Sequence, residues 1–318
     1  MSATLATDIK SFAIRELGFD LVGITTAEPL PGAEHLSRWV AGRAHGDMAY
    51  MASTSAVRAD PRLFVAGARS VICVAMSYHE PNEPPESGPV GTRAVVARYA
   101  RRRDYHKAIR PRLVRLGRLV SDRVPGASWR PAVDTAPLLE KELAQRAGLG
   151  WIGKNTCLIN RRLGSELLLG ELVTDVALPP DEPETDHCGT CRACLDVCPT
   201  RAFDGPGCLD ARRCISYATI EHRGELPKAL LPSLGAHLFG CDICQAVCPW
   251  NGRAPRSCNP ALATRQQLGC LTREALEGLD DAGWAALAAG TPLRRLDFRR
   301  FRRNLAAIAV APDQAEES

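Results

Sequence analysis

Two runs of closely spaced cysteines constrain this chain of 318 residues more than any other part of its sequence. The first reads CGTCRACLDVCP from residue 188, and the second reads CDICQAVCP from residue 241. Three cysteines separated by two residues each, then a fourth after three residues and a proline, form the spacing that holds a [4Fe–4S] cluster. The second run lacks its first cysteine, because Leu238 occupies that position. The cysteines are Cys188, Cys191, Cys194 and Cys198 in the first run and Cys241, Cys244 and Cys248 in the second.

The spacing also predicts how the two runs share their ligands. Three thiolates of one run surround a cluster from a tight loop, whereas the cysteine before the proline ligates the other cluster in two-cluster proteins. We therefore expect Cys248 to complete the first cluster. Cys198 should join Cys241 and Cys244 at the second cluster, which is then one thiolate short. The candidates for this last ligand are Cys208, Cys214 and Cys258.

Zinc and disulfide bonds are the alternatives to iron–sulfur clusters. Structural zinc also uses paired cysteines, but it has no use for a third CxxC step or for a C-P ending shared between two runs. The first residues, MSATLATDIK, lack a basic region followed by an apolar run, so they predict no signal peptide. No apolar stretch approaches the roughly 18 residues that cross a membrane. We therefore expect a cytoplasmic protein without a membrane partner, whose 13 cysteines serve metal ligation rather than disulfides.

The remaining sequence predicts an α+β fold with three parts. Helical and strand patterns alternate in the first half, including the continuous apolar run VICVAM at 71–76, which is typical of a strand covered on both faces. Asp104 is placed to cap a helix that continues to about Val124. We expect an α/β domain at 1–180, a ferredoxin-like domain with two [4Fe–4S] clusters at 181–252, and a helical, basic segment at 253–318.

The first domain should bind whatever receives the electrons, because two clusters in one small domain form a path for single electrons. No G-x-G-x-x-G sequence follows a strand, which argues against a Rossmann nucleotide site. A D-x-H-x-x-G corrinoid motif is absent too, since the nearest match, at 104–106, lacks the glycine. The arginines at 101–103 predict either a solvated face or a phosphate contact.

Asp134 is the carboxylate of most interest, because it ends an apolar strand and precedes a helix. One interpretation is a cap of that helix or of a turn, a role that aspartate often has. The other is a general acid that gives a proton to a reacting group. The residues alone leave both interpretations open.

Four strings, taken together and in this order, resemble the signatures of the epoxyqueuosine reductases. That family reduces the epoxide of epoxyqueuosine, a modified base at the wobble position of tRNA anticodons, to the alkene of queuosine, the last step of queuosine biosynthesis. It uses cobalamin and two [4Fe–4S] clusters, and the resemblance extends over roughly residues 5–310. The strings are VDTAPLLEK at 133–141, GLGWIGKN at 148–155, RCISY at 213–217 followed by TIEHRG at 219–224, and GCDICQAVCP at 240–249.

The resemblance implies roles for individual residues. It implies Cys214 as the eighth thiolate, which leaves Cys208 and Cys258 spare, and it implies Asp134 as the proton donor. It also implies that the 1–180 domain binds cobalamin, which lies between it and the cluster domain. The implied cobalamin contacts are Arg58, Asp134, Lys154, Asn155, Ser216, Cys241 and Asp242. The implied contacts to the tRNA backbone are Arg223, Arg299, Arg300, Arg302 and Arg303.

The resemblance also implies a mechanism. An external donor delivers two electrons one at a time through the clusters to cobalamin, while the protein positions the cofactor and supplies protons. A general acid typically contributes 10²–10⁴-fold to such a step. The wobble base must leave the anticodon stack to reach the cofactor. We expect a monomer, and because many members add a C-terminal helical-repeat domain that is missing here, tRNA contacts of that domain must be absent or replaced.

Two other functions compete with this interpretation. One is a corrinoid reductase of small molecules that resembles the reductive dehalogenases, although the respiratory ones usually carry a twin-arginine export signal that is absent here. The other is an electron-transfer subunit of the ferredoxin type with no substrate of its own. Failure to bind cobalamin would favour the second.

Overall fold

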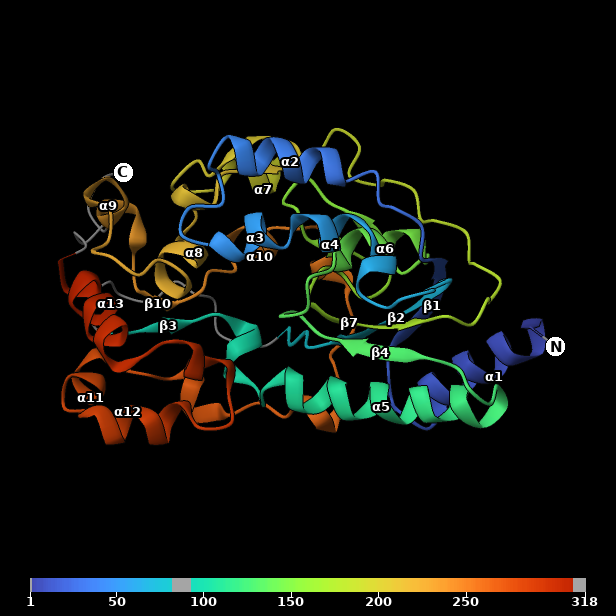
Figure 1. Ribbon diagram of the computed structural model, residues 1–318. Helices are drawn as coiled ribbons and strands as arrows, with labels where there is room; N and C mark the ends of the chain where they lie inside the picture. Colours follow the sequence, from blue (N-terminus) through green and yellow to red (C-terminus); the bar gives the residue numbers. More distant parts are fainter. Residues whose placement is uncertain (1, 82–92, 311–318) are drawn as a thin grey trace.

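The centre of the fold is an antiparallel sheet of four strands, in the order β1-β2-β7-β4 (Figure 1). The computed structural model describes residues 2–81 and 93–310. The strand β2 coincides with the predicted apolar run and is buried along its whole length, as the continuous apolar pattern requires. The strands are β1 (Leu21–Thr26), β2 (Ser70–Ser77), β7 (Leu167–Thr174) and β4 (Trp129–Ala132).

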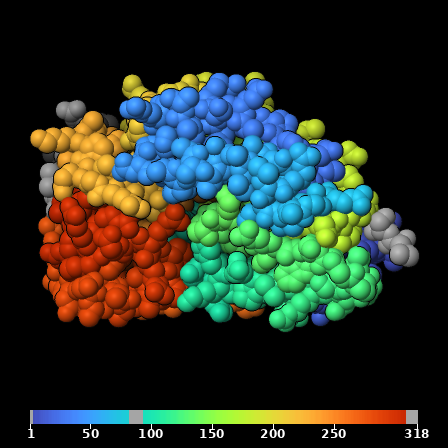
Figure 2. Space-filling model, in the orientation of Figure 1, coloured from blue at the N-terminus to red at the C-terminus, as the bar shows by residue number. Residues whose placement is uncertain are grey.

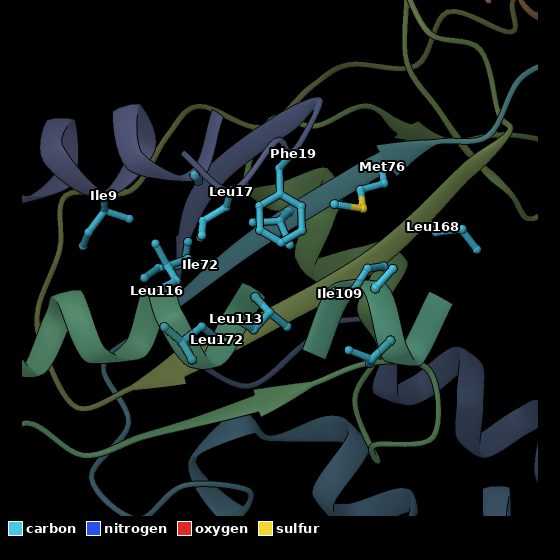
Figure 3. Packing of buried hydrophobic residues seen from close by; sticks show 14 of the residues in the cluster. Ile9, Leu17, Phe19, Ile72, Met76, Ile109, Leu113, Leu116, Leu168 and Leu172 are labelled. Atoms are coloured by element: carbon cyan, nitrogen blue, oxygen red, sulfur yellow. The ribbon is translucent and has the colours of Figure 1, made fainter. Parts of the chain in front are cut away.

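Helices cover both faces of this sheet. On one face α1 (Ser2–Arg15) and α5 (Tyr105–Arg123) pack on the strands, and Figure 3 shows aliphatic side chains from both regions meeting side chains of β2 and β7. The other face is covered by α6 (Glu140–Arg146), through a second apolar cluster that contains Leu143 and Val173. The predicted cap of α5 is confirmed, because the Asp104 side chain accepts a hydrogen bond from the backbone N–H of His106.

A glycine sets how closely α5 approaches β4. A Cβ atom at Gly117 would lie 2.4 Å from ring atoms of Trp129, so no larger residue fits there without movement of the ring. Trp129 begins β4, and the same strand leads into Asp134. The close contact between the helix and the strand therefore helps to fix the start of the segment that carries Asp134.

The cluster region is built from short elements, which is typical of loops that wrap a metal cluster. The two short helices inside the cysteine runs, one in each run, pack on each other. The elements are the hairpin β5 (Trp151–Ile152) and β6 (Leu158–Ile159), α7 (Ala193–Asp196), the hairpin β8 (Phe203–Gly205) and β9 (Cys208–Leu209), α8 (Ile215–Ile220), α9 (Leu231–Leu234), β10 (His237–Phe239) and α10 (Ile243–Ala246).

The C-terminal segment forms its own apolar cluster, in which Trp284 stacks on Phe301 with ring centroids 4.1 Å apart. It also returns to the first part of the chain. Strand β3 (Val95–Val96) pairs in parallel with β10, so a piece of the first 180 residues belongs to the sheet of the cluster region. The remaining helices are α2 (Ala33–Ala41), α3 (Ala49–Ser53), α4 (Ser55–Ala59), α11 (Arg273–Glu277), α12 (Asp281–Ala288) and α13 (Phe298–Val310).

Single 3₁₀ turns connect these elements, and one of them ends at Arg101, the first of three arginines for which the sequence predicted a solvated face or a phosphate contact. That expectation is wrong for Arg101 and Arg102, which are buried. Arg101 donates to the Val96 carbonyl at 2.6 Å, and Arg102 donates to the Leu262 carbonyl. The turns are η1 (Pro61–Leu63), η2 (Arg98–Arg101), η3 (Ala211–Arg213), η4 (Lys228–Leu230), η5 (Asn251–Arg253), η6 (Pro260–Leu262), η7 (Gln266–Gly269) and η8 (Pro292–Arg295).

No helix in the part of the chain that the structure describes is both long and apolar enough to span a membrane. The α+β class predicted from the sequence is confirmed.

Candidate functional site

Four cysteines of the two runs surround one cavity of about 220 Å³. Three come from the first run and the fourth is the last cysteine of the second run, as the crossing pattern predicts. Burial raises the pKa of the Cys194 thiol, and the negative charges of the other three raise it further. Four thiolates that face one another need positive charge between them, and iron supplies it. They are Cys188, Cys191, Cys194 and Cys248.

A second group of cysteines interacts around Cys214 and Cys244. Burial raises the pKa of Cys214 to about 11, and the charges of Cys241 and Cys198 raise it as well. Burial also raises the pKa of Cys244 well above its usual value, with contributions from Cys241 and Cys214 among its neighbours. Cys214 is therefore brought to this group, whereas Cys208 and Cys258 are exposed.

Both groups suit a multinuclear cluster better than one ion. Within residues 2–81 and 93–310, no three His, Cys, Asp or Glu side chains are close enough to hold a single metal ion. A tetrahedral zinc site keeps its sulfur ligands about 2.3 Å from one metal. A cubane holds its thiolates farther apart because each binds a different iron. The donor set and its spacing thus fit two [4Fe–4S] clusters.

The string GLGWIGKN forms a wall against the two cysteine loops, to which its side chains donate hydrogen bonds. A Cβ atom at Gly150, whose φ is +159°, would lie 2.2 Å from the Ile159 carbonyl oxygen, so this position needs glycine. The indole N–H of Trp151 donates to Cys188 Sγ at 3.4 Å. Lys154 Nζ donates to the carbonyls of Gly189 and Cys191, at 2.6 and 2.7 Å.

Asn155 continues this wall, since its Nδ2 donates to the Cys244 carbonyl at 3.4 Å. Lys154 and Asn155, both expected at cobalamin, thus hold the backbones of the two cysteine loops. Asp242, beside Cys241, is buried and accepts a hydrogen bond from the Arg98 backbone N–H at 2.6 Å. Ser216 is half-buried on α8.

Asp134 lies on the loop after β4, and its backbone has a φ of +48°, in the left-handed region that aspartate tolerates better than most residues. The helix-cap interpretation is wrong, because the N-cap of α6 is Leu139 and it has no side-chain cap. The Asp134 side chain is 40% exposed. One oxygen lies 3.4 Å from Arg295 Nη1 and 3.7 Å from His106 Nε2.

Three parts of the chain meet around Asp134. Arg295, from η8 of the C-terminal segment, also pairs with Glu221 at the end of α8, with 2.7 Å between Nη2 and Oε1. Burial acts to lower the pKa of Arg295, but the charges of Glu221 and Asp134 raise it overall. Tyr50 on α3 lies close enough to Glu221 to interact with its charge. Burial raises the pKa of Tyr50, and the negative charge of Glu221 raises it further. Figure 2 shows the blue, green and orange-red parts of the chain meeting in the middle of one face.

Arg58 holds the loop from the side of α4. It is buried, and it donates to the Leu138 carbonyl at 3.2 Å and to Thr54 Oγ1 at 3.0 Å. Burial lowers the pKa of Arg58. The structure therefore brings Arg58 to the Asp134 loop, as a support of its backbone.

The arginines expected at tRNA divide into two kinds. Arg300 donates to the carbonyls of Ile220 and Arg295, and Arg303 donates to those of Ala218, His222 and Gly224, so both are occupied inside the fold. Exposed guanidinium groups remain at three positions, of which Arg302 also touches the Glu277 carbonyl. These exposed arginines are Arg223, Arg299 and Arg302.

The sequence reasoning missed several residues of this site. Arg295 lies in the arginine-rich tail, and nothing in the sequence separates it from the arginines around it. His106 lies in the segment 104–106, which was considered only as a corrinoid motif. Glu140 lies in VDTAPLLEK, which was considered for Asp134. Glu221 is part of TIEHRG, one of the strings that carry the family resemblance. Its place in that string was the one signal that the sequence offered. Tyr50 carries no signal at all.

Two family models match the chain. A "4Fe-4S double cluster binding domain" matches residues 187–251, which favours iron–sulfur clusters over zinc. "Epoxyqueuosine reductase QueG, DUF1730" matches residues 58–135, the segment that ends just beyond Asp134.

Whole-length relatives agree with these models. The chain is 45% identical over 307 residues to the epoxyqueuosine reductase of Pseudomonas aeruginosa, which covers 96% of this chain and 84% of that protein. It is 39% identical over 310 residues to the epoxyqueuosine reductase of Escherichia coli, with 97% and 82% covered. These matches favour this enzyme over a dehalogenase-like reductase and over an electron-transfer subunit.

Solved structures show the same architecture. A crystal structure of a selenomethionine-labelled epoxyqueuosine reductase superposes with a TM-score of 0.86 at 26% identity, covering 96% of this chain and 81% of that one. An epoxyqueuosine reductase in complex with an epoxyqueuosine-modified tRNA-Tyr stem loop has a TM-score of 0.85 at 27% identity, with the same coverage. A Bacillus subtilis epoxyqueuosine reductase, whose aspartate-bearing catalytic loop is swung out of its active site, also has a TM-score of 0.85, at 26% identity and the same coverage.

Proposed function

The chain belongs to the epoxyqueuosine reductase family, and from that premise we propose that it reduces the epoxide of epoxyqueuosine in tRNA to the alkene of queuosine. The reaction breaks both carbon–oxygen bonds of the epoxide. It consumes two electrons and two protons and releases one water. The observation that carries the proposal is a half-exposed carboxylate at Asp134, which lies between His106 and Arg295 of the C-terminal segment.

Eight cysteines hold the two clusters in this proposal. The support is the convergence of their thiols into two groups and the match to a double cluster domain. Electrons enter from an external one-electron donor. The first cluster takes Cys188, Cys191, Cys194 and Cys248, and the second takes Cys198, Cys214, Cys241 and Cys244.

Asp134 is the general acid that protonates the leaving epoxide oxygen. Its carboxyl is open to solvent on one side and lies between Arg295 and His106, so a substrate oxygen can approach it. The B. subtilis relative has a catalytic loop that carries an aspartate and moves, which supports the same role here. Such an acid is worth about 10²–10⁴-fold in rate.

Cobalamin would supply a strongly reducing, nucleophilic cobalt. The residues around Asp134 fit a large cofactor with many amide groups, because they offer both charged and hydrogen-bonding side chains from three segments. His106 Nε2 is buried and has no hydrogen-bond partner among the described residues, which leaves it available to such a ligand. Tyr50, Asp134, Ser216 and Arg295 would face the cofactor, while Arg58, Lys154, Asn155, Cys241 and Asp242 would hold the loops around it.

The substrate is tRNA, as in the relative solved with a modified stem loop. Arg223, Arg299 and Arg302 are exposed, so they are the cationic groups available to phosphates. The target base leaves its stack to reach Asp134. We expect a monomer. We also expect a cytoplasmic location, because reduced thiols and tRNA share that compartment.

The test is direct conversion. Enzyme reconstituted with clusters and cobalamin is incubated with tRNA that contains epoxyqueuosine and with a chemical one-electron donor, and nucleosides are identified by mass spectrometry. Queuosine should form, and it should form only when iron, cobalamin and reductant are all present. A fully loaded enzyme that leaves the epoxide unchanged would contradict the proposal.

A further inference from the structure

A glutamate is buried in the middle of the central sheet, beneath the Asp134 loop. Glu171 of β7 lies opposite Cys73 of β2 and Ala132 of β4 and is 0% exposed. Its neighbours on this face are apolar. Neither of its carboxyl oxygens receives a hydrogen bond from another described residue. A lone ionised carboxylate in such surroundings is costly, so the group must share or hold a proton.

Glu140, the first residue of α6, connects this buried acid to the loop. Its Oε1 accepts a hydrogen bond from the backbone N–H of Asp134 at 2.5 Å. That bond holds the residue whose φ is +48°, a conformation that costs about 1 kcal/mol for residues other than glycine. Glu140 is half-buried as a residue, and its carboxyl group points inward.

The two carboxyl groups interact with each other. Burial raises the pKa of Glu140 to about 7, with the charge of Asp134 acting in the same direction. Burial also raises the pKa of Glu171 far above its usual value, with the charge of Glu140 next. Two carboxyl groups can hydrogen-bond only when one of them carries a proton. Glu171, whose pKa is raised far above its usual value, holds that proton and can donate it to Glu140.

The other charged groups around the pair do not neutralise it. Lys141 lowers the pKa of Glu140, but its Nζ donates to the Thr156 carbonyl at 2.7 Å. Arg58 is occupied by the Leu138 carbonyl. The remaining titratable groups that interact with the pair are Asp134, Cys73 and Tyr105.

We propose that Glu140 is the positioning residue of the Asp134 loop and that one proton, shared between Glu140 and Glu171, keeps it in that role. The inference rests on the general-acid role proposed for Asp134. With one proton the pair carries a single negative charge, and a Glu140 oxygen remains free to accept the Asp134 N–H. Without it, two like charges repel, and Glu140, the more exposed partner, moves away from the loop.

The sign of the pH dependence follows from the raised pKa. Unfolded Glu140 is ionised above its ordinary value of 4.5, whereas folded Glu140 keeps its proton up to about 7. The folded state is therefore favoured fully below 4.5, and this contribution is lost as the pH rises to about 7. The pKa of Glu171 is raised far above its usual value, so Glu171 keeps its proton above this window. The pair then still holds one proton after Glu140 ionises, and the loop anchor persists.

The first test compares Glu140→Ala with Glu140→Gln. Alanine removes the acceptor of the Asp134 N–H, and misplacement of a catalytic group costs up to about 10²-fold, so kcat should fall by about 10-fold or more while KM for tRNA stays the same. Glutamine keeps an acceptor oxygen and can donate to Glu171, so it should restore most of the loss. Hydrogen exchange of residues 133–139 should be faster in Glu140→Ala than in Glu140→Gln.

The second test is Glu171→Gln, which keeps a donor to Glu140 but removes the shared proton. An infrared titration of the wild type should keep a protonated-carboxyl band above pH 7, and the variant should lack that band.

Wild-type kcat in Glu140→Ala, or an identical infrared titration in Glu171→Gln, would overturn the proposal. Hydrogen exchange and infrared spectra need no substrate. They therefore decide this inference even if the wild type fails to reduce epoxyqueuosine, which would refute the proposed function instead.

Discussion

Replacing Trp151 with phenylalanine should lower the reduction potential of one cluster and leave the other unchanged. The indole N–H donates to Cys188 Sγ at 3.4 Å, and Trp151 is 0% exposed. Reduction adds a negative charge to the cluster, so a donor to its thiolate stabilises the reduced state more than the oxidised state. Loss of the donor therefore makes reduction harder.

The size of the effect follows from the hydrogen bond. A neutral donor in a folded protein contributes about 1 kcal/mol. For one electron, about 1.4 kcal/mol corresponds to 59 mV, so the upper limit is about 40 mV. The N···S distance is long, and only the difference between the two redox states counts, so we expect a decrease of roughly 20 mV.

The assay is a redox titration followed by electron paramagnetic resonance on the reconstituted protein. Phenylalanine keeps most of the ring contacts that Trp151 makes with His187 and Trp250, at centroid distances of 4.9 and 5.1 Å. Trp250→Phe is the matched control, because it alters a ring that lines the same cavity. A Trp151→Phe protein with full cluster content and an unchanged or higher potential would refute the reasoning.

Three further predictions concern the acid, the last ligand and the tRNA surface. Asp134→Asn should fold, load both cofactors and lose about 10²-fold or more in turnover, since it has no proton to give; near-normal epoxide reduction, measured by nucleoside analysis, would exclude Asp134 as the donor. Cys214→Ala should lose iron from one cluster and keep the other, while Cys208→Ala keeps both, as iron and sulfide analysis will report; the reverse result would reassign the ligand. Arg299→Gln combined with Arg302→Gln should weaken tRNA binding and flatten its salt dependence by about 0.7–0.9 per lost phosphate contact; an unchanged slope would remove both from the interface.

The sequence predicted what depends on local spacing. The cysteine runs, the buried strand at 71–76 and the Asp104 cap are set by residues close together in the chain, and the structure or the family match confirms each. The tail arginines were harder to predict. Arg300 and Arg303 bond to carbonyls about 80 residues away, and no local pattern encodes such contacts.

The same limit applies to the centre of the site. Arg295 reaches Asp134 across 161 positions of the chain, and β3 pairs with β10 across more than 140. Glu171 stands in an otherwise apolar strand, and no local pattern marks it as part of the site. Only the register with Cys73 and Ala132 shows that it faces the core.

One continuous segment links the acid to the clusters. Residues 134–155 start at the Asp134 loop, pass through α6 with Glu140, and end at the wall that bonds the cysteine loops through Trp151, Lys154 and Asn155. The short helix α6, packed on the sheet, separates the Asp134 loop from the residues that hold the cysteine loops. The distance between these two parts is therefore set by local structure.

That arrangement gives a reason for the order of the signature strings. In the proposed reaction VDTAPLLEK supplies the proton and its anchor, and GLGWIGKN, which follows it in the chain, holds the loops whose thiolates bind the clusters. A change in the length of α6 would move the acid relative to the clusters while leaving each site intact. The coupling of proton and electron delivery thus depends on a helix that makes no contact with substrate in this proposal.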